Sequence, residues 1–208
     1  MRVAAHPANQ RVMFNDTTSP AALLATRRSG KARDMIAPGP DPATLENILA
    51  LAMRVPDHGK LFPWRFIIVG QDQRAALTKL LRSAWIAENP AAVDQNLSAL
   101  DQFAHQAPTL ILLVSTPVID SKIPLWEQRL SAGAAAMNLL HAAHAHGFVG
   151  NWLTGWAAYS PNVTAAFGLG EGDRIVGYFF IGSPANELVE RPRPEPAAVI
   201  RHWTPPAD

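Results

Sequence analysis

The spacing of apolar residues along the chain predicts a series of helices. Leu45, Ile48 and Ala52 recur at intervals of three and four, which is the period of a helix with one buried face. Asp41-Pro42 would start this helix, because aspartate accepts a hydrogen bond at an N-cap and proline suits the first helical position. Similar patterns predict helices at residues 21–28, 71–87, 91–103, 126–146 and 161–167.

Continuous apolar runs predict strands at residues 65–69, 109–115 and 175–181, since short runs bounded by proline or glycine are typical of buried strands. The uninterrupted run at 109–115 indicates a central position in the sheet. Residues 150–155, which are bracketed by glycines, are expected to form a loop or a short strand. Helices and strands are mixed along the chain with short connections, so the pattern predicts one domain of the α/β or α+β class.

The two ends of the chain lack this periodicity. Residues 1–19 are polar and irregular, and we interpret them as a flexible leader before a single domain at residues 20–208. Six prolines follow residue 182, so most of the tail is expected to be extended. A partner subunit is the surface on which we expect this tail to lie.

Composition narrows the range of functions. The formal net charge is +1 and charged residues make up only 17% of the chain, which argues against nucleic acid as a partner. The hydrophobic fraction of 48% indicates much covered apolar surface, and a homodimer would cover it. The absence of cysteine excludes disulfides and cysteine nucleophiles. No signal peptide or membrane span is recognisable, so we expect a cytoplasmic protein without a membrane partner.

The densest basic cluster is Arg27-Arg28-Ser29-Gly30-Lys31, at the end of the first predicted helix. Arginine forks pair with phosphate oxygens and a serine hydroxyl adds a neutral donor, so the cluster suits a phosphate; a solvated basic turn is the alternative. Arg191-Pro192-Arg193 is a second candidate, because residues two apart in an extended segment project from one face. By itself it could equally be a solvated tail. Together the clusters predict two chain segments that converge on one anion.

Histidines mark two other places. His58 follows Asp57 in a polar loop between a predicted helix and a predicted strand. It could donate to a polar ligand or supply a proton near neutral pH, and a surface histidine is the alternative. His141, His144 and His146 suggest a metal site, but residue 146 leaves the helix face that the other two share and no carboxylate has a ligand spacing. We therefore expect no metal and interpret these as helix-end histidines.

Several common active-site motifs are missing. The glycines at positions 168, 170 and 172 lack the spacing of a dinucleotide-binding loop. The sequence contains neither a P-loop nor the nucleophile elbow of serine hydrolases. Trp152, in the glycine-bracketed segment, could pack against a planar ligand, whereas a position in the core is the commoner role of tryptophan.

Four separated segments, read together, resemble the nitroreductase family of FMN flavoproteins. They are Arg27-Arg28-Ser29, residues 54–66 (RVPDHGKLFPWRF), residues 147–152 (GFVGNW) and the proline–arginine tail. The likeness runs from about residue 21 to residue 203 and is closest to compact bacterial members. It implies an α+β homodimer with a central mixed sheet flanked by helices, an extended C-terminal tail, and two FMN sites at the subunit interface.

The resemblance also implies which residues bind FMN. Lys31 would face the pyrimidine edge of the flavin, while Arg54 and His58 would come from the partner subunit. Leu153 stands where close relatives have arginine, so one polar contact would be replaced by packing. The full set of implied cofactor-binding residues is Arg27, Arg28, Ser29, Lys31, Arg54, Pro56, Asp57, His58, Trp152, Leu153, Thr154, Arg191 and Arg193.

The activity implied by the resemblance is hydride transfer from NAD(P)H to FMN and then to a nitro compound, a quinone or a similar flat acceptor, in a ping-pong mechanism. The flavin would carry the chemistry, so no catalytic side chain is expected. Two other functions stay open. A flavin-binding carrier or regulatory protein could share the fold without the activity. A basic interaction domain could bind phosphopeptide or nucleic acid, although the net charge of +1 argues against it.

Overall fold

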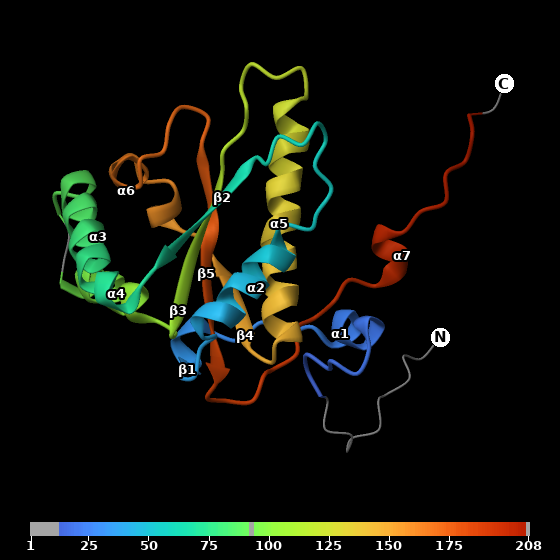
Figure 1. Ribbon diagram of the computed structural model, residues 1–208, viewed down its shortest axis with the longest axis horizontal. Coiled ribbons are helices and arrows are strands. Elements are labelled where there is room, and N and C mark those ends of the chain that lie inside the picture. Colours follow the sequence, from blue (N-terminus) through green and yellow to red (C-terminus); the bar gives the residue numbers. More distant parts are fainter. Residues whose placement is uncertain (1–12, 92–93, 207–208) are drawn as a thin grey trace.

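One sheet forms the centre of the computed structural model, which describes residues 13–91 and 94–206 (Figure 1). The strand order is β1-β5-β3-β2, and β4 also pairs with β5. Each of these pairings is antiparallel, whereas a mixed sheet was expected. Strand direction depends on how the connecting helices return the chain, and apolar spacing carries no information on that. The strands are β1 Met35–Ile36, β2 Trp64–Val69, β3 Thr109–Ser115, β4 Val149–Leu153 and β5 Arg174–Pro184.

Helices cover both faces of the sheet, and the α+β class is confirmed (Figure 1). α2 and α5 lie on one face, and α3, α4 and α6 lie on the other. The helices are α1 Pro20–Thr26, α2 Pro42–Ala52, α3 Arg74–Glu88, α4 Asp94–His105, α5 Leu125–Ala145, α6 Pro161–Ala166 and α7 Pro196–Val199, with 3₁₀ turns at Ala32–Asp34, Gln71–Gln73 and Trp156–Ala158.

The position of β3 in the sheet explains why its sequence is apolar without alternation. All seven of its residues are buried, because β5 and β2 flank it and helices cover both of its faces. Leu110 and Leu112 belong to the core under α3 and α4, while Ile111 and Leu113 belong to the core under α2 and α5. The predicted central position of this strand is confirmed.

Three helices begin as their sequences predict. The side chains of Ser19, Asp41 and Ser160 accept hydrogen bonds from the backbone N–H groups three residues on, and each of them precedes a proline. The end of α1 differs from the prediction: the helix stops at Thr26, and Arg27 is already extended, with φ −54° and ψ 124°. The two arginines therefore lie in a loop after the helix, and the predicted end of this helix at residue 28 is wrong.

The ends of the chain differ from each other in structure. Residues 1–12 of the predicted leader lie outside the described residues, whereas Asn15 and Asp16 form hydrogen bonds with α1. In the proline-rich tail the helix α7 interrupts an otherwise extended chain, which runs away from the sheet (Figure 1). Trp203 in this tail is 82% exposed. Within the described part of the chain, no helix is long and apolar enough to cross a membrane.

Arg74, at the start of α3, is fully buried and stabilises the surrounding loops. Its guanidinium donates to the carbonyl groups of Val69 at 3.1 Å, Ala104 at 2.8 Å and Gln106 at 3.3 Å. Val69 is the last residue of β2, Ala104 lies in the last turn of α4 and Gln106 follows that helix. The last carbonyls of a helix have no partner within it. Burial lowers the pKa of this guanidinium, and the group is held in place by neutral backbone acceptors.

Glu88, at the end of α3, connects this helix to α6. Its carboxylate accepts hydrogen bonds from Ser160 at 2.6 Å, Trp156 at 2.7 Å and Asn162 at 2.8 Å. The bond from Ser160, followed by those from Trp156 and Asn162, lowers the pKa of Glu88 below its usual value of 4.5. These donors favour the charged carboxylate in the folded state.

Stability is therefore expected to depend on the ionisation of Glu88. Because its folded-state pKa is lowered, the contribution is complete above the unfolded-state pKa and is lost as pH falls through the folded-state pKa. Glu88→Gln should lower the free energy of unfolding by roughly 1–2 kcal/mol at pH 7, and by less at pH 4. Urea unfolding at both pH values measures this difference, with the exposed Glu46→Gln as control. An equal loss at both pH values would contradict the assignment.

Candidate functional site

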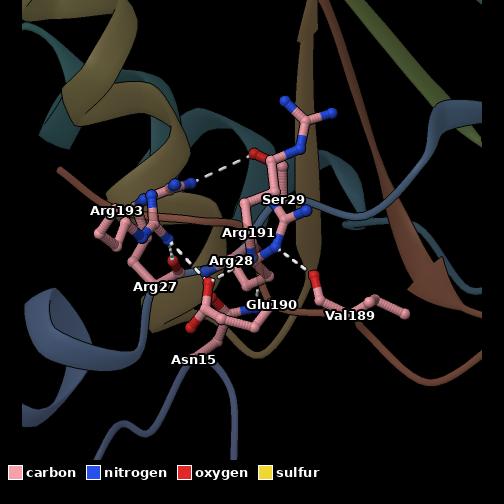
Figure 2. Close-up of polar contacts among 8 residues, drawn as sticks. All are labelled: Asn15, Arg27, Arg28, Ser29, Val189, Glu190, Arg191 and Arg193. Carbon is pink, nitrogen blue, oxygen red and sulfur yellow. Dashed lines mark hydrogen bonds and ion pairs between the residues drawn. The ribbon is translucent and has the colours of Figure 1, made fainter. Parts of the chain in front are cut away.

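A basic loop directly after α1 carries the first predicted cluster (Figure 2). The Nη1 atom of Arg27 donates to Ser29 Oγ at 3.2 Å. The Nε atom of Arg28 donates to the carbonyl oxygen of Val189 at 2.5 Å. All three residues of the Arg27-Arg28-Ser29 motif are half-buried, so these side chains lie against the protein body.

The proline-rich tail returns to this loop, as the sequence predicts. Arg193 Nη2 lies 3.4 Å from the carbonyl oxygen of Arg27 and 3.2 Å from the carboxylate of Glu190 (Figure 2). The backbone N–H of Arg191 donates to the same carboxylate at 2.7 Å. The structure thus brings together two basic segments that are 166 residues apart in the sequence.

Positive charge exceeds negative charge in this cluster. Burial is the main cause that lowers the pKa of Arg27, followed by repulsion from Arg193 and Arg28. Burial also lowers the pKa of Arg28, followed by repulsion from Arg191. Glu190 raises both values and offsets only part of this effect. Cations gathered in this way are stabilised by an anion placed among them, and arginine forks match the oxygens of a phosphate.

The rest of the basic loop runs along the sheet. Gly30 is buried, and a Cβ atom at this position would lie 3.1 Å from the side chain of Val149. Asn151 of β4 donates from Nδ2 to the carbonyl of Gly30. The side chain of Lys31 points outward and is 69% exposed. Its Nζ atom lies 4.0 Å from a carboxylate oxygen of Asp34. A cavity of about 260 Å³ lies between this loop and residues 184–189.

Strand β4 ends in the segment Trp152-Leu153-Thr154. The ring of Trp152 is 37% exposed and packs on Phe179, with ring centroids 5.2 Å apart. Its indole N–H donates to a backbone carbonyl of β5 at 2.9 Å. Gly177 of β5 is required here, because a Cβ atom would collide with the indole ring. Leu153 is half-buried and Thr154 is exposed, so the segment presents a fixed, partly exposed aromatic surface.

The loop after α2 holds the second predicted group of residues. Asp57 shapes the loop, because its carboxylate accepts the backbone N–H groups of Leu61 at 3.2 Å and Phe62 at 2.8 Å. Lys60 and Phe62 have φ values of 54° and 50°, a conformation that is costly for residues other than glycine. The carboxylate therefore supports a strained loop that exposes Arg54, Pro56 and His58.

This loop is attached to α5 by three side chains of that helix. The hydroxyl of Ser131 donates to the carbonyl of Pro56 at 2.6 Å, and His58 Nδ1 lies 2.6 Å from a carboxylate oxygen of Glu127. Asn138 donates to the carbonyl of Arg54 at 3.4 Å. The side chains of α5 thus fix both the backbone of the loop and the orientation of the imidazole.

The structure places His58 and the arginine cluster near opposite ends of α5. The positive charge of Arg27 lowers the pKa values of His141 and His144 after the main effect of burial, so the arginine cluster lies near the end of α5. His58 contacts Glu127 in the first turn. Glu127 and His141 are fourteen positions apart, which corresponds to about 21 Å of helix.

A sequence model of the nitroreductase family matches residues 24–183. The chain belongs to the nitroreductase family. This confirms the resemblance found in the sequence, and at the level of the family it confirms an enzyme.

Named relatives agree with this assignment. YdjA of Escherichia coli (strain K12), by name a candidate NAD(P)H nitroreductase, is 37% identical over 84% of this chain and 94% of its own length. A candidate NAD(P)H nitroreductase of Haemophilus influenzae is 39% identical over 77% of this chain and 86% of its own.

Solved structures show the same fold. A nitroreductase-like protein from Bacillus cereus superimposes with a TM-score of 0.75 at 23% identity, over 89% of this chain and 96% of its own. The FMN- and NADPH-dependent nitroreductase NfnB from Sphigopyxis sp. strain HMH has a TM-score of 0.70 at 21% identity, over 89% and 99% of the two chains. The predicted nitroreductase-like fold is confirmed.

Three asparagines and one glutamate around this nitroreductase-family site were not predicted from the sequence. They form hydrogen bonds with backbone groups or orient an imidazole, and neither role produces a recognisable spacing of residues in the sequence. A motif search finds cation clusters, but it does not show which distant amide reaches a loop carbonyl. The missed residues are Asn15, Glu127, Asn138 and Asn151.

His141 and His144 lie in α5, whereas His146 follows the end of this helix. His144 is 1% exposed, and burial is the main cause that lowers its pKa to about 3. Its Nε2 accepts the backbone N–H of Gly150 at 3.3 Å. His141 is half-buried and His146 is exposed. Among the described residues, no group of three histidine or acidic side chains is arranged to hold a metal ion.

Proposed function

We propose that this member of the nitroreductase family is an FMN-dependent oxidoreductase that uses NAD(P)H to reduce nitro compounds, quinones or similar flat acceptors. The observation that carries the proposal is the convergence of Arg27, Arg28, Arg191 and Arg193 from two distant segments. Relatives named for NAD(P)H, and a solved neighbour named for FMN and NADPH, support the choice of cofactor and reductant.

The residues present fit FMN at both of its ends. The unbalanced arginine cluster suits a phosphate carrying two negative charges, and Ser29 adds a neutral donor beside it. The exposed face of Trp152 suits a planar ring system. Lys31 extends from the same loop as the arginines and would hold a positive charge at the pyrimidine edge of the flavin.

FMN supplies the chemistry when bound, by accepting a hydride and passing it to an acceptor. The protein would bind the phosphate through its arginines and orient the ring with the segment Trp152-Leu153-Thr154. The positive charge of Lys31 would favour negative charge on the ring edge that it faces. His58, oriented by Glu127, would offer a hydrogen bond from the partner subunit. No side-chain nucleophile is needed in this scheme.

We propose a homodimer in which α5 forms the interface. Trp126 is 68% exposed and Leu130 is 53% exposed, and the partly exposed Gly133, Met137 and His141 continue the same helix face. Exposed apolar stripes of this length are typical of protein interfaces. Two antiparallel copies of α5 would place the first half of one helix beside the second half of the other. His58 of one chain would then approach Arg27 of its partner, which supports a site shared by two subunits.

An anaerobic visible spectrum of the purified protein incubated with FMN tests the proposed function. Flavin bands that bleach on addition of NADH or NADPH, and return when a quinone or nitro compound is added, are the expected result. Bands that persist with both nucleotides would indicate a flavin carrier or regulatory protein and would overturn the enzymatic proposal. The absence of bound FMN would overturn the whole proposal and leave the basic cluster to another anion.

A further inference from the structure

Asn15 precedes the part of the chain that matches the nitroreductase family model, residues 24–183, yet it contacts the basic loop. Its side-chain Oδ1 accepts the backbone N–H of Arg28 at 2.8 Å, and its Nδ2 donates to the backbone carbonyl of Arg28 at 3.1 Å (Figure 2). One amide side chain thus satisfies both backbone groups of a single residue. The arrangement fixes the peptide groups on either side of Arg28.

The neighbouring contacts extend this attachment. The backbone N–H of Asn15 donates to the carbonyl of Thr26 at 3.1 Å, and the backbone N–H of Asp16 donates to the hydroxyl of Thr26 at 2.9 Å. The Thr26 carbonyl lies at the end of α1, where acceptors have no helical partner. Residues 15 and 16 therefore hold the chain at the point where the helix gives way to the basic loop.

Asn15 is suited to this place by its backbone as well as by its side chain. Its φ value is 54°, in the left-handed region that asparagine adopts more readily than most residues. The side chain is half-buried, so its two hydrogen bonds are partly shielded from water. Substitution of Asn15 by alanine would remove the amide group and also strain the backbone in its left-handed conformation. Substitution by glycine would remove the amide group without this strain.

We infer that Asn15 is a positioning residue for the proposed phosphate site, acting through the backbone of Arg28. The inference rests on the proposed function, because it assumes that the arginine cluster binds the FMN phosphate. On one side of Arg28, Asn15 fixes the backbone, and on the other side Asn151 holds the carbonyl of Gly30. The loop is thereby prepared before the ligand arrives, so less ordering entropy is lost on binding.

The experiment compares FMN with riboflavin, which has the same ring and ribityl chain but no phosphate. Titration of the full-length apoprotein, followed by flavin fluorescence, gives both dissociation constants. Asn15→Gly should weaken FMN binding about tenfold and leave riboflavin binding within about twofold. Thr17→Gly adds the same backbone freedom at an exposed neighbour and should change neither constant.

The outcomes separate this inference from the proposed function. Equal losses of FMN and riboflavin affinity in Asn15→Gly would mean general loosening of the fold and would overturn a role at the phosphate. Unchanged FMN affinity in Asn15→Gly, with wild-type protein that binds FMN, would overturn the inference alone. Wild-type protein that fails to bind FMN would overturn both.

Discussion

Simultaneous replacement of Arg27 and Arg193 by alanine should weaken FMN binding by about 100-fold or more. A charge-assisted hydrogen bond is worth roughly 1.5–3 kcal/mol, and a tenfold change in affinity corresponds to about 1.4 kcal/mol. Arg27 is half-buried and Arg193 is 55% exposed, so the lower part of this range applies. The purified variant should therefore be colourless at concentrations at which the wild type is yellow.

The two arginines are chosen because they come from different segments and meet at one place. Arg193 Nη2 is 3.4 Å from the carbonyl oxygen of Arg27, and the charge of Arg193 is among the causes that lower the pKa of Arg27. Without an anion this repulsion destabilises the loop, so the double variant should fold at least as stably as the wild-type apoprotein. A loss of FMN affinity without a loss of stability would identify a binding role.

A matched control lies in the same tail. Arg201 is exposed, and Arg201→Ala removes the same charge from a position outside the cluster. It should leave the dissociation constant of FMN unchanged, which separates local contacts from a general effect of net charge. Equal FMN affinity in the Arg27/Arg193 double variant and the wild type would contradict the phosphate assignment.

The elements with local signals were predictable from the sequence. Asp41-Pro42 identifies the start of α2, and the uninterrupted run of β3 identifies a strand buried on both sides. The two-residue strand β1 is too short for any period and was missed. The end of α1 was misplaced. There the carbonyl of Thr26 accepts a hydrogen bond from the backbone N–H of Asn15, eleven residues earlier in the sequence. A contact across such a distance has no trace in local spacing.

In the candidate site, too, the features with a local sequence signal were predicted and those that depend on distant contacts were not. Both basic segments were predicted because clusters of arginine and lysine are visible in the sequence itself. That the two segments meet was predicted because one anion could bind to both. The two groups around Arg27 and His58 were assigned to different subunits only through the family resemblance. In the structure His58 contacts Glu127, whereas the arginine cluster lies near His141, about 21 Å further along α5. Which residues contact FMN stays a prediction, and so does the dimer.

Gly133→Arg is expected to convert the proposed homodimer into a monomer. Gly133 lies near the middle of the exposed face of α5, between Trp126 and His141. A Cβ atom built on it meets no atom within 4 Å in the protomer, so the fold has room for a larger residue. Arginine also favours a helix interior over glycine by up to about 1 kcal/mol. The isolated protomer should therefore remain folded, while a bulky cation at the centre of the interface prevents close approach of two helices.

The monomeric variant should also lose FMN, because each proposed site needs Arg54 and His58 of the partner subunit. Light scattering coupled to gel filtration gives the oligomeric state, and absorbance of the same peak gives the flavin content. Ser83→Arg, an exposed position on α3 across the sheet, is the control and should keep both the dimer and the flavin. A Gly133→Arg protein that stays dimeric would refute α5 as the interface. A monomer that retains full flavin would show that one chain is sufficient and would refute the shared site.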